Sequence, residues 1–144
     1  MTEAVEVAIE LALLARAQAF AAANDLAISL PNIEFTPPVV SKTAKYLRAT
    51  FMPADTARLV IGSGSDQHYG FLQLDVFYGV GGGEIAPGRI AANIISYFKR
   101  DTLITSNDVR IRVSRTPLRG PQSSKDAWTM LPVRIPYNCY AIPA

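Results

Sequence analysis

Apolar and polar residues alternate most clearly near the middle of the chain. Leu72, Leu74 and Val76 are two positions apart, with Gln73 and Asp75 between them. A period of two predicts a β-strand with one buried face and one less buried face. We therefore expect Gln73 and Asp75 to lie on the less buried side of this strand.

A glycine-rich turn at 79–83 and an amphipathic helix follow this strand. Pro87 suits the first turn of a helix, where its missing N–H is no loss. Ile90, Ile94 and Phe98 recur every four residues, so one face of the helix is apolar. The pattern predicts a helix from Pro87 to Phe98 that packs on the strand before it.

A second, longer helix is predicted at 2–23. Its apolar arc covers more than half of the helical circumference: Leu11 widens the arc, and Val7 and Leu14 interrupt the polar side. The surface helix of a monomer needs a narrower stripe. This helix is therefore either deeply buried or in contact with a second subunit through Val7, Leu11 and Leu14.

The rest of the chain reads as strands joined by polar or extended segments. Pro132 and Pro136 cannot donate to a sheet ladder, so the last strand is expected at an edge or broken by bulges. We expect an extended connector at 24–45, a polar loop at 116–126, and strands at 45–52, 57–61, 109–114 and 127–140.

These elements predict an α+β fold in the order α-β-β-β-α-β-β. The expected sheet is mostly antiparallel, with four to five strands and both helices packed on one face. The chain has 144 residues, and we expect residues 1–144 to form a single domain.

Composition is typical of a folded soluble protein. Hydrophobic residues make up 49% and charged residues 18%. No run approaches the roughly 20 apolar residues that a membrane span needs, and glutamates stand near the N-terminus where a signal peptide carries positive charge. The one cysteine, Cys139, excludes an internal disulfide and suits a reducing compartment.

Charge is distributed unevenly around a net value of +2. Residues 1–84 hold five Lys or Arg and nine Asp or Glu, a balance of −4, whereas residues 85–144 hold nine and three, a balance of +6. Folding can bring the two halves back together. Alternatively, the subunit has an acidic and a basic flank, which suits head-to-tail association.

No catalytic or metal-binding motif is visible. His68 is the only histidine, so neither a zinc site nor a histidine-based nucleophile unit with Cys139 is expected. The glycine run lacks the P-loop signature, and Glu84 stands at the third glycine position of the dinucleotide fingerprint. We expect no enzyme activity, metal or cofactor.

The clustered charge feature consists of arginines. Arg110 and Arg112 alternate with apolar residues on one predicted strand, Arg115 follows it, and Arg134 lies on the last strand. The pattern favours a solvated sheet face, with a subunit contact second and a DNA surface third. With Asp75, these arginines are the candidate subunit or DNA-lumen residues.

Several segments together resemble the tail terminator, or tail-completion, proteins of long-tailed phages. The resemblance spans most of residues 30–140 and departs at Tyr78-Gly79, where a proline is expected soon after the strand. It is carried by Pro37-Pro38, Tyr46–Ala49, Pro53-Ala54, Ile61-Gly62, Gly70–Tyr78, Gly83, Trp128 and Pro132–Tyr137.

This resemblance implies a structural protein that assembles as a six-membered ring. Such a ring caps the finished tail tube, stops its polymerisation and offers a surface to the head–tail connector, and genomic DNA passes through its hole without sequence recognition. The expected location is the tail or neck of the virion, and the host cytoplasm during assembly, with no membrane. The alternatives are another neck component, such as the connector, or a small nucleotide-binding protein that uses the turn at 79–83 and Glu84.

Overall fold

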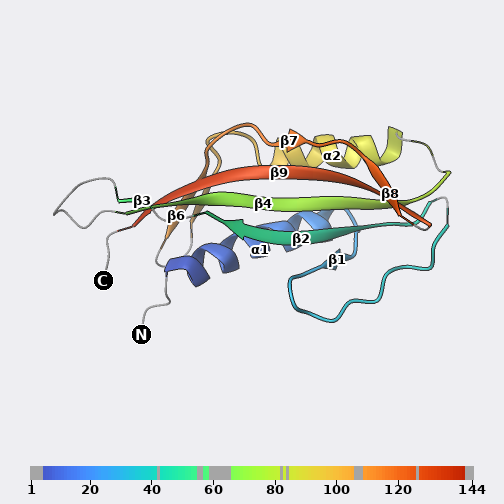
Figure 1. Ribbon diagram of the computed structural model, residues 1–144, viewed down its shortest axis with the longest axis horizontal. Helices are drawn as coiled ribbons and strands as arrows, with labels where there is room; N and C mark the ends of the chain where they lie inside the picture. Colours follow the sequence, from blue (N-terminus) through green and yellow to red (C-terminus); the bar gives the residue numbers. More distant parts are fainter. Residues whose placement is uncertain are drawn as a thin grey trace.

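A large sheet backed by two helices forms the fold. The computed structural model describes residues 5–41, 43–54, 57–58, 66–81, 83, 85–105, 109–125 and 127–141. Within them lie two helices, α1 (Val5–Ala23) and α2 (Ile85–Tyr97) (Figure 1). The strands are β1 (Ile28–Ser29), β2 (Lys45–Pro53), β3 (Ala57–Arg58), β4 (Asp66–Gly79), β5 (Leu103–Thr105), β6 (Arg110–Val113), β7 (Leu118–Arg119), β8 (Ser123–Lys125) and β9 (Trp128–Ala141).

The sheet is built around two long central strands. Its order is β1-β2-β4-β9-β6-β5, with β3 paired to β4, and β7 and β8 paired to β9. β4 and β9 pair along their whole length, from Asp66 opposite Ala141 to Gly79 opposite Trp128. The pairing of β1 with β2 is parallel, and the other pairings among the described strands are antiparallel.

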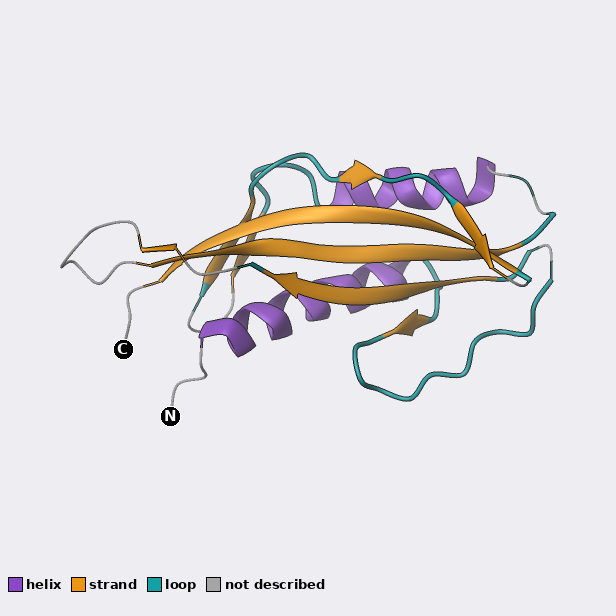
Figure 2. Cartoon of the chain, in the orientation of Figure 1, coloured by secondary structure: helices purple, strands orange, loops and turns teal. Residues whose placement is uncertain are grey.

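Both helices pack on the same face of the sheet. Leu47, Val76 and Leu131 lie side by side in the registers of β2, β4 and β9, and all three belong to the core cluster with buried residues of both helices. The helices also meet each other, since the rings of Phe20 and Tyr97 are 5.4 Å apart. Figure 2 shows both helices behind the strands, so this view looks onto the opposite face.

The end of α1 is fixed by backbone hydrogen bonds. Leu26 N donates to Ala21 O and Asp25 N to Ala22 O, while Asp25 takes a φ of 57°. This is the Schellman arrangement that satisfies the last carbonyls of a helix. The helix therefore ends at Ala23, as the sequence predicts.

The α+β class and both helices are confirmed, but the predicted number and order of strands were wrong. The described residues form nine strands rather than four to five. The four strands that the sequence did not predict, β1, β5, β7 and β8, have two or three residues each. Such short segments carry too few residues to show a period of two. Residues 2–4 and 59–61 of the predicted elements, and Glu84, lie outside the described residues.

The prediction that the last strand lies at an edge or is broken was also wrong. β9 is a central strand, paired with β4 on one side and with β8, β7 and β6 in turn on the other. Pro132 and Pro136 fall between the segments paired with these short strands, and their carbonyls accept from Gly120 N and Ser114 N on that outer side. In an antiparallel ladder the N–H and C=O of a residue point to the same side. The missing N–H groups therefore leave the β4 pairing intact.

Candidate functional site

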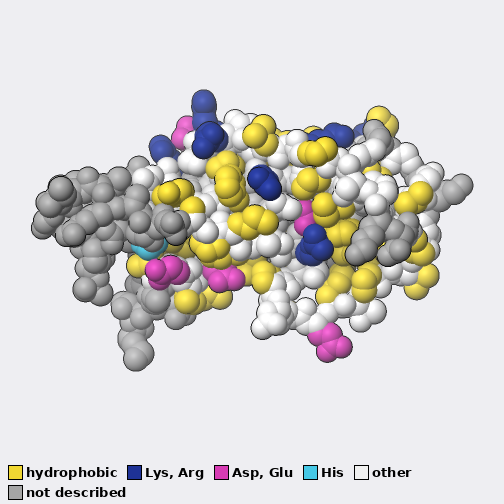
Figure 3. Space-filling model, viewed as in Figure 1, with side chains coloured by type: hydrophobic (Ala, Val, Ile, Leu, Met, Phe, Trp, Pro, Cys, Tyr) yellow, Lys and Arg dark blue, Asp and Glu magenta, His cyan; other side chains and the backbone are white. Residues whose placement is uncertain are grey.

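The sheet face opposite the helices carries the candidate surface. Side chains alternate between the two faces of a strand, so the residues between the core positions point to this face. Arg48 of β2 is in register with Asp75 of β4, and Gln73 of β4 is in register with Arg134 of β9. Figure 3 shows hydrophobic and cationic side chains mixed over this face.

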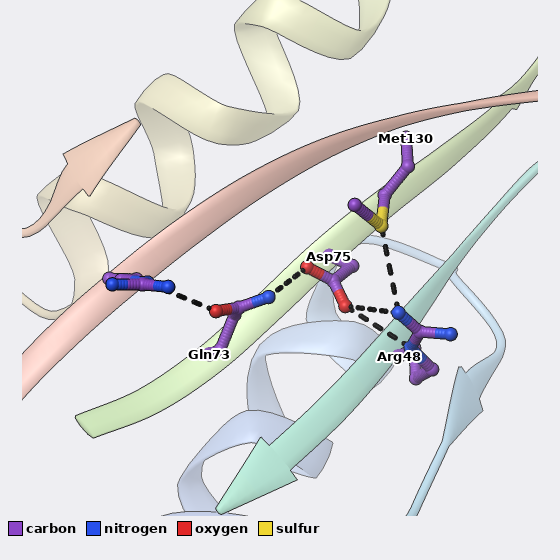
Figure 4. A network of polar contacts seen from close by, with 5 residues as sticks. Arg48, Gln73, Asp75 and Met130 are labelled. Carbon is purple, nitrogen blue, oxygen red and sulfur yellow. Dashed lines mark hydrogen bonds and ion pairs between the residues drawn. The ribbon is translucent and has the colours of Figure 1, made fainter. Parts of the chain in front are cut away.

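A chain of polar contacts crosses the three central strands (Figure 4). Arg48 Nε and Nη2 both donate to Asp75 Oδ2, at 3.1 and 2.9 Å. Gln73 Nε2 donates to Asp75 Oδ1 at 2.8 Å, and Arg134 Nε donates to Gln73 Oε1 at 3.2 Å. Two arginines are thus held in fixed positions on β2 and β9.

Asp75 lies on the predicted face, but the expectation that it is partly exposed was wrong. Its side chain is 0% exposed, because Arg48 and Gln73 occupy both of its oxygens and cover it. A buried carboxylate is tolerated when it is paired and hydrogen-bonded. Asp75 therefore positions Arg48, whose own side chain is 48% exposed, and is not itself an accessible surface residue.

An aromatic cluster covers one end of the same face. The rings of Tyr46 and Phe77 are stacked with centroids 4.7 Å apart, and Trp128 meets Tyr46 edge-on at 5.0 Å. Phe35, from the connector, lies 5.2 Å from Tyr46. Burial raises the pKa of Tyr46 above its ordinary value. The cluster anchors the proline-rich connector onto the sheet.

The predicted arginine face is present on β6. Arg110 and Arg112 are exposed, whereas Ile111 and Val113 between and after them are 0% exposed. Arg112 Nη1 lies 3.7 Å from Asp101 Oδ1, and both side chains remain open to solvent. Arg115 is exposed in the bend that follows β6.

Two grooves divide the arginines on this face. One has a volume of about 430 Å³ and is lined by Tyr69, Phe71, Arg112 and Arg115 among others. We call it the Arg112 groove.

The second groove has a volume of about 550 Å³ and brings Arg134 together with Arg119, Leu118 and Met130. We call it the Arg134 groove. Arg110 lines neither of these two grooves. The structure therefore joins Arg112 with Arg115, and places Arg134 in a different recess.

Sequence reasoning missed several residues of this face. Arg48, Tyr69, Phe71 and Leu118 were not singled out, nor was Arg119, which lines the Arg134 groove while its guanidinium lies near Gly88 of α2. Arg48 and Phe71 occupy the less buried positions of alternating strands, a signal that the sequence does contain. Leu118 and Arg119 lie in the segment expected to be a loop, so the sequence held no comparable signal for them.

The outer side of α1 is exposed to solvent. Val7 is 43% exposed and Leu11 is 55% exposed, whereas Leu14 is partly buried and packs against the core. Ile9 and Leu13, on the other side of the helix, are almost completely buried. The helix is therefore buried on one side only, and Val7 and Leu11 remain accessible.

The described residues offer no metal-ligand cluster. No group of three or more His, Cys, Asp or Glu within them could hold a metal ion. Burial raises the pKa of the Cys139 thiol, which disfavours the reactive thiolate. None of the described helices is long and apolar enough to cross a bilayer.

A comparison with protein families decides the class of the protein. The family model for phage tail terminator proteins matches residues 8–137. The chain belongs to the phage tail terminator protein family. Tail terminators are structural rather than enzymatic proteins, so the surfaces described above belong to a component of the phage tail and of the virion.

A solved protein structure resembles this tail terminator family member over its full length. The two chains are 27% identical, the match covers 99% of this chain and 100% of the other, and the TM-score is 0.78. No match was found among curated proteins. The structural likeness supports the fold, and the family supplies the functional class.

Proposed function

We propose that the chain acts as a single-domain subunit of a ring that closes the phage tail. The ring of six copies sits on the end of the finished tail tube, stops further addition of tube subunits and presents its other side to the head–tail connector. Assembly takes place in the host cytoplasm, and the ring then stays in the virion neck. The family match over residues 8–137 is the observation that carries this proposal.

The geometry of the surfaces supports an assembly role. A ring subunit that also touches a tube and a connector needs several separate contact surfaces. The chain offers the sheet face with its two grooves, and the exposed side of α1 with Val7 and Leu11. Contiguous apolar patches exposed on a folded domain are typical of interaction sites.

The exposed arginines are compatible with the passage of DNA through the ring. Arginines attract phosphates through charge, and phosphate contacts by themselves carry no sequence information. Arg110, Arg115 and Arg134 are exposed and have no ion pair among the described residues. Any of them that faces the hole of the ring would attract the DNA backbone without reading bases.

The test adds purified chain to growing tail tubes of the same phage. We expect elongation to stop and a particle of six times 15.6 kDa to appear, in solution or at tube ends. Light scattering gives the mass, and electron microscopy gives the tube length and the position of the ring. Tubes that keep growing, together with a chain that stays monomeric, would contradict the proposal. A ring found on the connector side alone would assign the chain to another neck component.

A further inference from the structure

We infer that neighbouring subunits join head to tail, with the exposed side of α1 from one copy seated in the Arg112 groove of the next. The inference rests on the proposed ring and names the two surfaces that close it. The occupant of the groove is a second copy of this chain.

The α1 surface combines apolar and acidic side chains. Val7 and Leu11 are exposed, and Glu6 is exposed on the same turn as Val7. Glu10 is half-buried, and its carboxylate helps to raise the pKa of the buried Tyr137. Residues four apart on a helix lie about 6 Å from each other on one side. No ion pair among the described residues involves Glu6 or Glu10. This surface therefore presents the exposed carboxylate of Glu6, with the half-buried Glu10 at its edge, beside two exposed aliphatic side chains.

The Arg112 groove offers the complementary chemistry. Tyr69 is 40% exposed and Phe71 is 36% exposed, and both line the groove with Arg112 and Arg115. Arg115 has no ion pair among the described residues, and the contact of Arg112 with Asp101 is long, at 3.7 Å, between two open side chains. Two arginines beside two aromatic rings are complementary to an α1 surface that combines two exposed aliphatic side chains with the exposed carboxylate of Glu6 and the half-buried one of Glu10.

The two surfaces cannot meet within one chain. α1 packs on the core face of the sheet, whereas Arg112 is in register with Asn138 on the opposite face. In the sheet order, β4 and β9 separate β6 from β2. A contact between two different surfaces of identical subunits is heterologous, and repetition of it gives a ring when the rotation closes.

Charge complementarity favours the Arg112 groove over the Arg134 groove. In the Arg134 groove, Arg134 already donates to Gln73, so one of its two arginines is held inside the sheet network. Arg112 and Arg115 keep their guanidinium groups available for a partner. The Arg134 groove is therefore left for a different neighbour and supplies a matched control.

Cysteine cross-linking tests the contact directly. Leu11→Cys and Phe71→Cys are made in separate chains, mixed, and treated with a short bismaleimide. We expect cross-linked dimers in the mixture and none from either variant alone. The wild-type chain is the baseline, because Cys139 is 1% exposed. Dimers from Leu11→Cys alone would indicate a two-fold contact and overturn the inference, as would a mixture that yields none.

Charge reversal tests the pairing of the two surfaces. Glu6→Arg with Glu10→Arg, or Arg112→Glu with Arg115→Glu, should weaken association roughly a hundredfold, because like charges then face each other. All four changes in one chain should restore association, since opposite charges face each other again. Arg119→Glu, in the Arg134 groove, should leave self-association unchanged. Melting curves check that each variant folds.

The outcomes separate this inference from the proposed function. Rings that form and cap tubes while the charge-reversed pairs associate normally would overturn the inference alone. Loss of association with Arg119→Glu but not with the Arg112 and Arg115 reversals would assign the contact to the other groove and overturn it as well. A wild-type chain that neither associates nor stops tube growth would overturn both.

Discussion

Arg48 donates two hydrogen bonds, of 3.1 and 2.9 Å, to the same carboxylate oxygen of Asp75. The carboxylate is completely buried, while the side chain of Arg48 is 48% exposed and its guanidinium lies 4.9 Å from the centre of the Phe77 ring. The pair links β2 to β4 on the face that has no helix. A buried acid thus fixes a cation that solvent and partners can reach.

Asp75→Ala should reduce the free energy of unfolding by about 1–3 kcal/mol. The variant loses the three hydrogen bonds that Asp75 accepts from Arg48 and Gln73 and leaves their donors without this partner. Urea denaturation measures the loss. The double variant Arg48→Ala/Asp75→Ala should lose less stability than the two single variants lose when their changes in unfolding free energy are added, because the two residues act as a pair. Strict additivity would contradict the coupling.

Leu74→Ala should cost about 2–5 kcal/mol of stability, since it leaves a cavity in a core where Leu74 is 0% exposed. Leu118→Ala is the matched control, because Leu118 is 71% exposed, and its change should stay within about 0.5 kcal/mol. Equal losses at the two positions would mean that the faces of the sheet are assigned wrongly.

Gly70→Ala should destabilise the fold by about 1–3 kcal/mol through overpacking. A Cβ at this position would clash with the carbonyl oxygen of Met52 and lie 2.8 Å from Cα of Pro53, so the backbones of β2 and β4 must move apart. Gly88→Ala provides the comparison. A Cβ there meets only a guanidinium nitrogen of Arg119, at 3.4 Å, and alanine favours the helix by up to about 1 kcal/mol. The melting temperature should therefore fall for Gly70→Ala and rise for Gly88→Ala.

Stability should fall as the pH rises from 10 towards 12. Burial, with smaller effects of Cys139 and Glu10, raises the pKa of Tyr137 from 10.0 to about 12. The folded chain holds the phenol proton more tightly than the unfolded chain does. The contribution of Tyr137 to the free energy of unfolding is therefore complete below pH 10.0, and it is lost as the pH rises through the pKa of the folded chain. Denaturation across this range should show a shallower decline for Tyr137→Phe and an unchanged one for the exposed control Tyr69→Phe. An equally steep decline in Tyr137→Phe would exclude Tyr137 as a cause.

The sequence alone was sufficient for the elements with a strong period. Leu72, Leu74 and Val76 are all 0% exposed, as their alternation predicts. Ile94 and Phe98 are likewise completely buried. In these segments one face meets the core over many residues, so the hydrophobic pattern records the fold directly.

The remaining features depend on contacts between distant segments. Asp75 is polar in sequence but buried in the fold, because Arg48, 27 positions away, supplies its partner. β9 is central despite Pro132 and Pro136, because three short strands pair with it and leave gaps at the prolines. The Arg112 groove likewise joins residues from β4, β6 and β9, a proximity that no local pattern could show.

The unbroken pairing of β4 with β9 has a mechanical consequence. Each strand has 14 residues, and the two are paired from end to end. A pull along the strands from opposite ends loads this ladder in shear, so many hydrogen bonds carry the force at once instead of opening one after another. In the ring proposed above, the subunit would carry such a load when the particle bends or when DNA leaves under pressure. Its two longest strands form the part of the chain best suited to bear that tension.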